Sequence, residues 1–123
     1  MSAIDLKSLG ASADAVQRHY DVGNDFYDLW LDAETKSYTA AMFVDAPADS
    51  LEAAQVRKVD FHAVQARVPA GGRVLDIGCG WGNFLHRAVA VHGAAQGVGL
   101  SLSREQTAAI SERSAVGVEV RLE

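Results

Sequence analysis

Three things that this sequence lacks narrow its class before any motif is considered. It has one cysteine, Cys79, so no disulfide can form within the chain, and a reducing, cytoplasmic setting is the expectation. No apolar run approaches the roughly 20 residues that span a bilayer, and residues 1–10 lack the apolar stretch of a signal peptide. Basic residues are in deficit: 11 Lys and Arg against 16 Asp and Glu give a net charge of -5, which argues against nucleic acid as the main partner.

The remaining composition suits a small domain with a core of its own. Hydrophobic residues make up 49% of the 123 residues, so we predict one domain. No metal-ligand spacing is present, and no metal site is predicted. In the first half of the sequence, helices are predicted over residues 13–20, 25–31 and 51 to about 67. Between the second and third of them, a polar connector is expected at 32–36 and an extended segment or loop at 37–43.

The third of these helices has the clearest boundaries. Ser50 is its expected N-cap. Its apolar stripe is expected to run through Val56, Val59, Ala63 and Ala66, which would face the core.

The most informative segment is a strand followed by a glycine turn and a helix. Residues 73–77 predict the strand and residues 83–92 the helix, and between them lie Gly78, Gly80 and Gly82. In such a turn the backbone can approach a ligand, and the helix N-terminus offers free N–H groups. The spacing G-x-G-x-G differs from the dinucleotide fingerprint G-x-G-x-x-G. With an aspartate two residues before the first glycine, it is typical of S-adenosylmethionine (SAM) methyltransferases.

The second half continues as an α/β unit. Further strands are expected at 95–100 and 118–122, with a helix at 104–113 between them. With strand 73–77 innermost, these elements make half of a doubly wound parallel sheet. An apolar strand would then lie at an exposed edge. We therefore expect the N-terminal part of a longer protein, a chain completed by a second polypeptide, or a homo-oligomer.

Four further segments occur in a fixed order around the glycine turn: HYDVGNDFY at 19–27, YTAAMF at 38–43, SLEAAQ at 50–55 and GLSLSREQ at 99–106. In this order and spacing, from about Ala15 to the last residue, the chain resembles the cyclopropane-fatty-acyl-phospholipid synthase and mycolic acid methyltransferase family. The resemblance implies a Rossmann-like class I SAM methyltransferase fold, incomplete after three strands. Residues 1–68 would form a helical cover over the active site, and 69–123 the first half of the SAM-binding domain.

The glycine turn and the resemblance together give the following cofactor-binding candidates: Tyr38, Thr39, Asp76, Gly78, Gly80, Gly82, Ser101, Leu102 and Gln106. The resemblance implies that the first two line the methionine end of SAM. An aromatic ring or a hydroxyl oxygen beside a sulfonium is physically reasonable. Structural alternatives stay open for three of them: Asp76 as a turn carboxylate, Gln106 as part of an S-x-x-Q capping box, and Tyr38 as a packing residue under the N-terminal helices.

One position departs from the family pattern. The resemblance implies a cysteine after the Tyr-Ser/Thr pair in cyclopropane synthases, where it helps to hold a bicarbonate ion that acts as the base. This chain has Ala40 there. Ring closure requires removal of a proton after methyl transfer, so the alanine favours simple methylation.

The remaining polar and aromatic residues carry weaker expectations. A polar cluster near the N-terminus, which the resemblance implies lies over the active site, consists of His19, Tyr20, Asp21 and Asn24. Its histidine is a structural hydrogen-bonding group or a general base. Trp81 either packs under the turn or touches the ligand, and Cys79 is a small buried filler. Three histidines are expected on helix surfaces: His62, His86 and His92.

The function predicted from these observations is SAM-dependent methyl transfer to a small-molecule or lipid acceptor, with S-adenosylhomocysteine (SAH) as the product. The groups that act on the acceptor would lie beyond Glu123. Three alternatives remain: a cyclopropane-fatty-acyl synthase, a truncated or split SAM-binding chain without activity of its own, and a nicotinamide dehydrogenase. The last is disfavoured by Ser101, which stands where a ribose-binding acid is expected.

Overall fold

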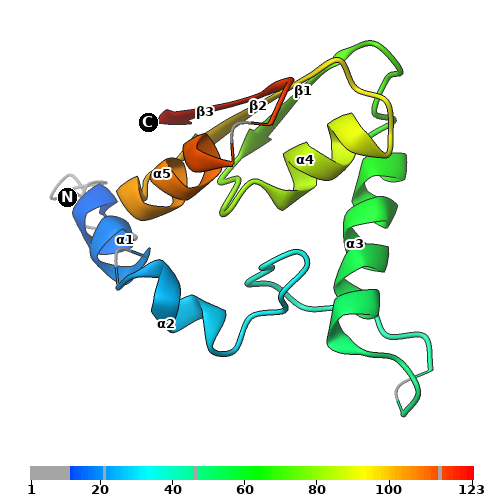
Figure 1. Ribbon diagram of the computed structural model, residues 1–123, viewed down its shortest axis with the longest axis horizontal. Coiled ribbons are helices and arrows are strands. Elements are labelled where there is room, and N and C mark those ends of the chain that lie inside the picture. The colour runs from blue at the N-terminus through cyan, green and yellow to red at the C-terminus, as the bar shows by residue number, and fades with distance from the viewer. Residues whose placement is uncertain (1–11, 21, 46, 114) are drawn as a thin grey trace, which may run out of the picture.

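The computed structural model describes residues 12–20, 22–45, 47–113 and 115–123 (Figure 1). Helices and strands follow one another in this order: α1 (Ala13–Tyr20), α2 (Asn24–Asp28), α3 (Leu51–Gln65), β1 (Arg73–Ile77), α4 (Asn83–Ala90), β2 (Gln96–Ser101), α5 (Arg104–Glu112) and β3 (Val118–Leu122). Among these residues no helix has the length and apolar character to cross a membrane.

The three strands form one parallel sheet in the order β1-β2-β3, as the sequence predicted. Arg73 pairs with Gln96, and Gly97 with Val118, so β1 and β2 begin level and β3 begins one residue further along β2. Helices α4 and α5 lie on one face of the sheet, and on that side α3 stands beside α4 and α1 beside α5 (Figure 1). The carboxyl ends of β1 and β2 face the loop at residues 35–39 across a cavity.

All the predicted helices except α1 end earlier than expected, and for α2 and α4 the local hydrogen bonds show why. The prediction for α2 ran to residue 31, but after Asp28 the amides of Leu29 and Trp30 bond to carbonyls three residues back, which tightens the chain into a turn. The prediction for α4 ran to residue 92. The helix ends two residues earlier, because the amides of Val91 and His92 both bond to the carbonyl of Arg87, and the chain then turns at Gly93 with φ +77°.

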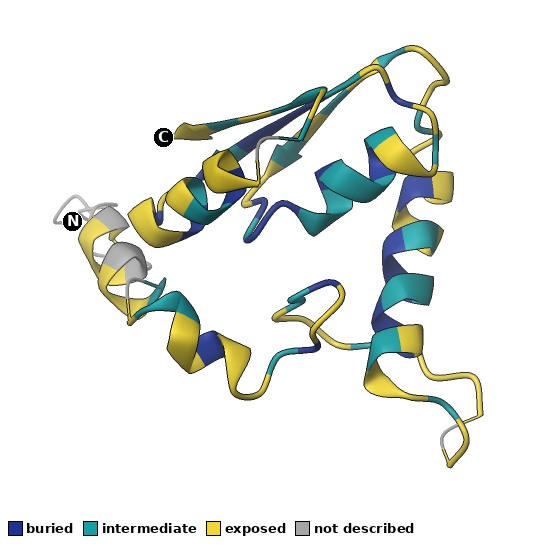
Figure 2. Ribbon diagram, in the orientation of Figure 1, coloured by how far each residue is buried: buried dark blue, intermediate teal, exposed yellow. Residues whose placement is uncertain are grey.

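The core lies between the sheet and α4 and α5, where Figure 2 shows the buried segments facing each other. Leu85, Cys79 and Ile110 are its buried centre, and half-buried side chains from β1 and β3 pack around them. Leu85 is fully buried and fits against β2 only because Gly97 and Gly99 carry no side chain there. A Cβ at Gly99 would lie 2.7 Å from both Cys79 Sγ and Leu85 Cδ1. Close packing of helix on strand thus depends on these glycines.

Helix α3 shows where the stripe prediction succeeded and failed. Its cap is as predicted, since Ser50 Oγ accepts a 3.1 Å bond from the Ala53 amide. Val59 and Ala63 are buried, but the prediction for Ala66 was wrong, because that residue lies past the last helical turn and is exposed. Two polar residues, Gln55 and Lys58, are buried in its place. The buried face of α3 meets a polar loop rather than a purely apolar core.

Asp60 joins α3 to the α/β unit. Its carboxylate accepts from Arg87 Nη2 on α4 at 2.8 Å and lies 2.8 Å from Nε2 of His92. The expectation that His92 is a plain surface residue was wrong, because this contact leaves it half-buried. The hydrogen bonds from Arg87 and His92 hold the pKa of Asp60 below its ordinary value.

We expect Asp60→Asn to lower the free energy of unfolding by about 1 kcal/mol at neutral pH, since the carboxylate is a third exposed to solvent. A depressed pKa stabilises the fold above the ordinary carboxyl pKa of about 4, and that contribution is lost as the pH falls through the lowered value. Urea unfolding of both proteins between pH 7 and pH 3 measures this. The gap between them should close on acidification; a constant gap would contradict the assignment.

Candidate functional site

A cavity of about 530 Å³ lies at the carboxyl ends of β1 and β2. It is bounded by four regions: the loop before α3, one face of α3, the glycine turn, and the segment that links β2 to α5. Its lining includes Tyr20, Thr35, Ser37, Tyr38, Thr39, Lys58, Val59, Gly78, Cys79, Gly80, Trp81, Ser101, Leu102 and Gln106. Most predicted cofactor-binding residues thus meet in one cavity; Asp76 and Gly82 are not part of its lining.

The glycine turn presents bare backbone to this cavity. Gly80 has φ +55°, a conformation that favours glycine, and a Cβ built there would meet no atom within 4 Å. The amides of Gly78 and Cys79 both bond to the carbonyl of Leu100, at 2.9 and 3.0 Å, which ties the turn to the end of β2. A ligand can therefore approach the peptide units themselves.

Gly82 has a different role from the other two glycines. It is buried, and a Cβ there would lie 3.0 Å from Ile110 Cγ1 of α5. Its backbone also has positive φ, at +75°, and it stands as the N-cap of α4. Gly82 thus permits the close approach of α4 and α5, which corresponds to the packing role of the third glycine in a phosphate-binding turn.

Asp76 lies on the helix side of β1 and is half-buried. Burial raises the pKa of its carboxyl group. It accepts no hydrogen bond from any described residue, so the structure gives it neither the turn-orienting bonds nor the place in the cavity that the sequence suggested.

The segment after β2 supplies a buried polar corner. Ser101 Oγ donates to Gln106 Oε1 at 2.9 Å and accepts from the Ser103 amide at 3.1 Å. Ser103 caps α5 as the S-x-x-Q pattern predicts, with its Oγ 3.3 Å from the Gln106 amide. The Gln106 side chain does not return to the cap but turns toward Ser101. No hydrogen bond links its Nε2 group to any residue that the structure describes.

Tyr38 and Thr39 line the cavity from the loop before α3. The Tyr38 ring lies 4.9 Å from Trp30 and 5.9 Å from Tyr27, between ring centroids, so it also belongs to an aromatic cluster with α2. Tyr38 thus packs against the N-terminal segments and also lines the cavity, while its contact with the methionine end of SAM stays a prediction. Thr39 Oγ1 accepts a 2.6 Å hydrogen bond from Lys58 Nζ.

The polar loop at residues 32–37 is the part of the site that sequence reasoning missed, since those residues were taken for a connector and the start of an extended segment. Asp32 is buried, and its carboxylate accepts from the Thr35 amide and hydroxyl, at 2.6 and 2.9 Å, and from the Ser37 amide at 3.0 Å. Asn83 Nδ2 at the start of α4 donates to the carbonyl of Thr35. An Asx-type pattern, aspartate with a threonine three residues on, was the available signal.

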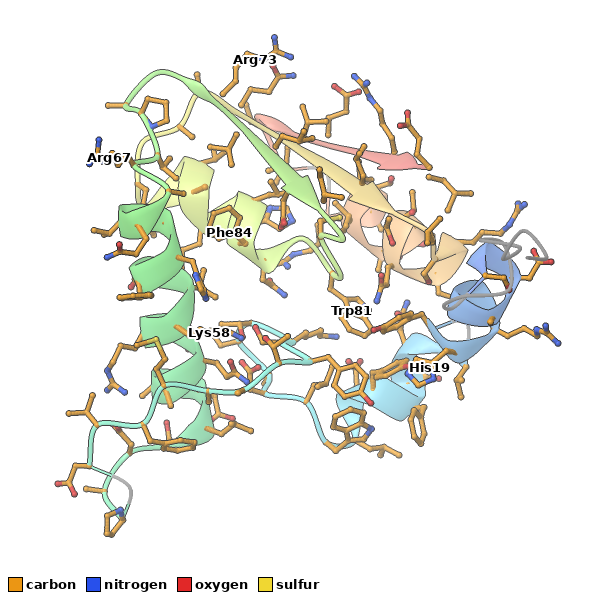
Figure 3. The ribbon with its side chains drawn as sticks, turned by 180° about the vertical axis from the view of Figure 1, so that it is seen from behind. His19, Lys58, Arg67, Arg73, Trp81 and Phe84 are labelled. Carbon is orange, nitrogen blue, oxygen red and sulfur yellow. The ribbon has the colours of Figure 1, made fainter. Side chains whose placement is uncertain are left out.

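Helix α3 holds the same loop from the other side. Gln55 Nε2 donates to the carbonyls of Thr39 and Ser37, at 2.9 and 3.3 Å. Lys58 follows one turn later and lines the cavity, as seen from behind in Figure 3. Burial lowers the pKa of Lys58, and the negative charge of Asp32 opposes this.

The glycine turn also meets the N-terminal polar cluster. Trp81 is buried, and its Nε1 donates to Asn24 Oδ1 at 2.8 Å across the molecule. Its side chain is packed as the first alternative expects, and it also lines the cavity, so contact with a ligand stays a prediction. Tyr20 lines the cavity as well, whereas His19 is exposed and not part of the lining; Asp21 lies outside the described residues.

Sequence-based expectations also exist for Cys79, His62 and His86. Cys79 is buried, and burial with the nearby Asp76 raises the pKa of its thiol to about 11, which suits an inert filler. His62 is exposed as expected. His86 is half-buried with Nε2 unpartnered among the described residues, so its surface placement was wrong; burial and Arg113 lower its pKa.

Comparison with known proteins gives a consistent set of relatives. The family described as mycolic acid cyclopropane synthetase matches residues 7–121. A probable fatty acid methyltransferase of Pseudomonas putida is 44% identical over 94 residues, which is 76% of this chain and 23% of that protein. The cyclopropane mycolic acid synthase MmaA2 of Mycobacterium tuberculosis is 40% identical over 97 residues, 79% of this chain and 33% of the relative.

Solved structures agree with the sequence matches. The structure of MmaA2 superimposes with a TM-score of 0.83 at 35% identity, over 94% of this chain and 41% of that one. Mycolic acid cyclopropane synthase CmaA1, crystallised with SAH and CTAB, gives 0.83 at 33% identity, over 93% and 41%. The chain thus spans about a quarter to a third of the curated relatives it matches.

Proposed function

Since this chain belongs to the mycolic acid cyclopropane synthetase family, we propose that its cavity binds SAM and that the protein transfers the methyl group to a lipid or other small-molecule acceptor. The Rossmann-like class I methyltransferase fold is shown by the superpositions. Within it, residues 1–68 would be the cover and 69–123 the first half of the SAM-binding domain.

The glycine turn carries this proposal. Its backbone faces a cavity of about 530 Å³ without side chains in between, a size within the range of about 300–1,000 Å³ for small-molecule sites. The CmaA1 structure named above was solved with SAH, the product of SAM after methyl transfer. The open glycine turn, the size of the cavity and this likeness together support SAM as the ligand.

The chain's own residues would act mainly by positioning. SAM supplies, when bound, a methyl group on a sulfonium centre. Gly78 and Gly80 allow the backbone to come close to it, and the ring of Tyr38 offers a face that attracts a cation. Trp81 and Leu102 exclude water from the cavity walls. Holding the acceptor and the methyl group about 3–3.5 Å apart and in line would account for much of the acceleration.

Ala40 favours plain methylation over ring formation. It lies just outside the cavity, adjoining Thr39, and has no polar side-chain atom with which to hold a base. Methylation needs no such base once a labile proton can leave to water. The names of the relatives include both reactions, a probable fatty acid methyltransferase and a cyclopropane mycolic acid synthase, and both suggest a lipid acceptor.

We expect the protein that carries this chain to attach an intact methyl group to its acceptor. The test uses SAM with a deuterated methyl group and a panel of lipid extracts, with mass and NMR analysis of the products. Retention of all three deuterons supports methylation. Loss of one deuteron with a cyclopropane product would contradict it and favour the synthase. Calorimetry with NAD serves as the negative control for cofactor choice.

A further inference from the structure

We propose that Lys58 and Thr39 together form the subsite for a ligand carboxylate, namely that of the amino-acid tail of SAM. This rests on the proposed function. Lys58 is buried, lines the cavity, and directs Nζ to Thr39 Oγ1 at 2.6 Å. The sequence motifs had not marked Lys58.

Lys58 has N–H donors that its described hydrogen bond does not use. An ammonium group has three N–H bonds and no acceptor, and the described contacts of Nζ account for one of them. Lys58 forms no ion pair with any described carboxylate within 4 Å. Asp32, whose negative charge acts on Lys58, already accepts from three donors of Thr35 and Ser37. A buried cation without a paired anion is costly, and an anionic ligand would relieve that cost.

The hydrogen bond also sets the direction of the Thr39 hydroxyl. Because Lys58 can only donate, Thr39 Oγ1 is the acceptor, and the hydroxyl proton is free to donate elsewhere. The carbonyl of Thr39 is already taken by Gln55 Nε2 at 2.9 Å. Thr39 therefore offers the cavity a hydroxyl donor, and its oxygen keeps one further lone pair.

Two adjacent donors, one of them charged, match the two oxygens of a carboxylate. The other charged side chains that line the cavity do not compete for this role. Lys36 is paired with Asp28 of α2, His62 is exposed, and Glu123 is an acid. Lys58 is thus the cation best placed to neutralise one carboxylate in the cavity.

The experiment compares two ligands that differ in the amino-acid tail: SAH, which has it, and 5′-methylthioadenosine, which lacks it. Calorimetry on the protein that carries this chain should show SAH binding to Lys58→Met weakened about 10- to 100-fold, the effect of losing a hydrogen bond to a charged group. Methylthioadenosine affinity should change less than about 2-fold. Arg67→Met, an exposed cation beyond the end of α3, is the charge-matched control and should change neither.

Each outcome decides one question. If the unmodified protein binds neither ligand, the proposed function fails. If Lys58→Met keeps its circular dichroism spectrum but weakens both ligands equally, or neither, the carboxylate role is overturned and the lysine is structural. Thr39→Val decides the matter should Lys58→Met not fold. It removes the hydroxyl only, and it should weaken SAH about 2- to 10-fold with methylthioadenosine unchanged; unchanged SAH affinity contradicts the proposal.

Discussion

Replacing Gly80 with valine is expected to weaken SAH binding by at least about 100-fold, some 2.7 kcal/mol, while the sheet and its helices stay folded. A Cβ at this position meets no protein atom within 4 Å because it points into the cavity. The branched side chain would therefore occupy the space that the ligand needs at the backbone. Calorimetry with SAH measures the loss, and far-ultraviolet circular dichroism checks the fold.

Backbone strain has to be separated from this steric effect. Valine at φ +55° is strained, which costs roughly 1–2 kcal/mol of stability. Gly71 provides the matched control, since it has φ +71°, a Cβ there also meets nothing within 4 Å, and it does not line the cavity. Gly71→Val should lose similar stability and keep its SAH affinity. Equal SAH affinity in both variants would show that the ligand does not contact the turn.

Leu85→Ala is expected to cost about 3–4 kcal/mol of unfolding free energy, the largest stability effect of any change considered. Leu85 is fully buried at the centre of the core and fills the space over Gly97 and Gly99. Neither glycine has a side chain that could move into the void, so the cavity would stay open. Urea unfolding followed by tryptophan fluorescence measures the change.

The same substitution at Leu29 is its control. Leu29 follows α2 and is 82% exposed, so its truncation should change stability by less than about 0.5 kcal/mol. A loss at Leu85 no greater than at Leu29 would mean that the core is packed elsewhere than between β2 and α4.

The α/β half was predictable because its signals are local. Strand β1 and its glycine turn are formed by consecutive residues, so a short pattern is enough to predict them. The bounds of β1 and β3 are those that the sequence predicted. Helix ends were less predictable, since each depends on one hydrogen bond or one positive φ. Gly82 shows the limit within the motif itself: its alternation with Gly78 and Gly80 is plain, but its packing on Ile110 of α5 exists only in three dimensions.

The polar wall of the cavity was not predictable for a related reason. Gln55 and Lys58 occupy one face of a helix, and sequence reasoning places such polar residues in solvent. Their burial follows from a loop that supplies partners 16 and 19 residues away. The spacing of apolar residues along a helix predicts which face is buried against an apolar core. It does not predict a face that is buried against carbonyls and hydroxyls of a loop.

The bonds that close this cavity also imply an order of folding. Strand pairing joins Arg73 to Gln96 across a single helix, whereas Asn83 reaches back 48 residues to Thr35 and Trp81 reaches back 57 to Asn24. Closing longer loops costs more chain entropy and slows the formation of contacts. The sheet with α4 and α5 should therefore form first as a nucleus, and the ligand cavity should appear only when the N-terminal segments dock onto it.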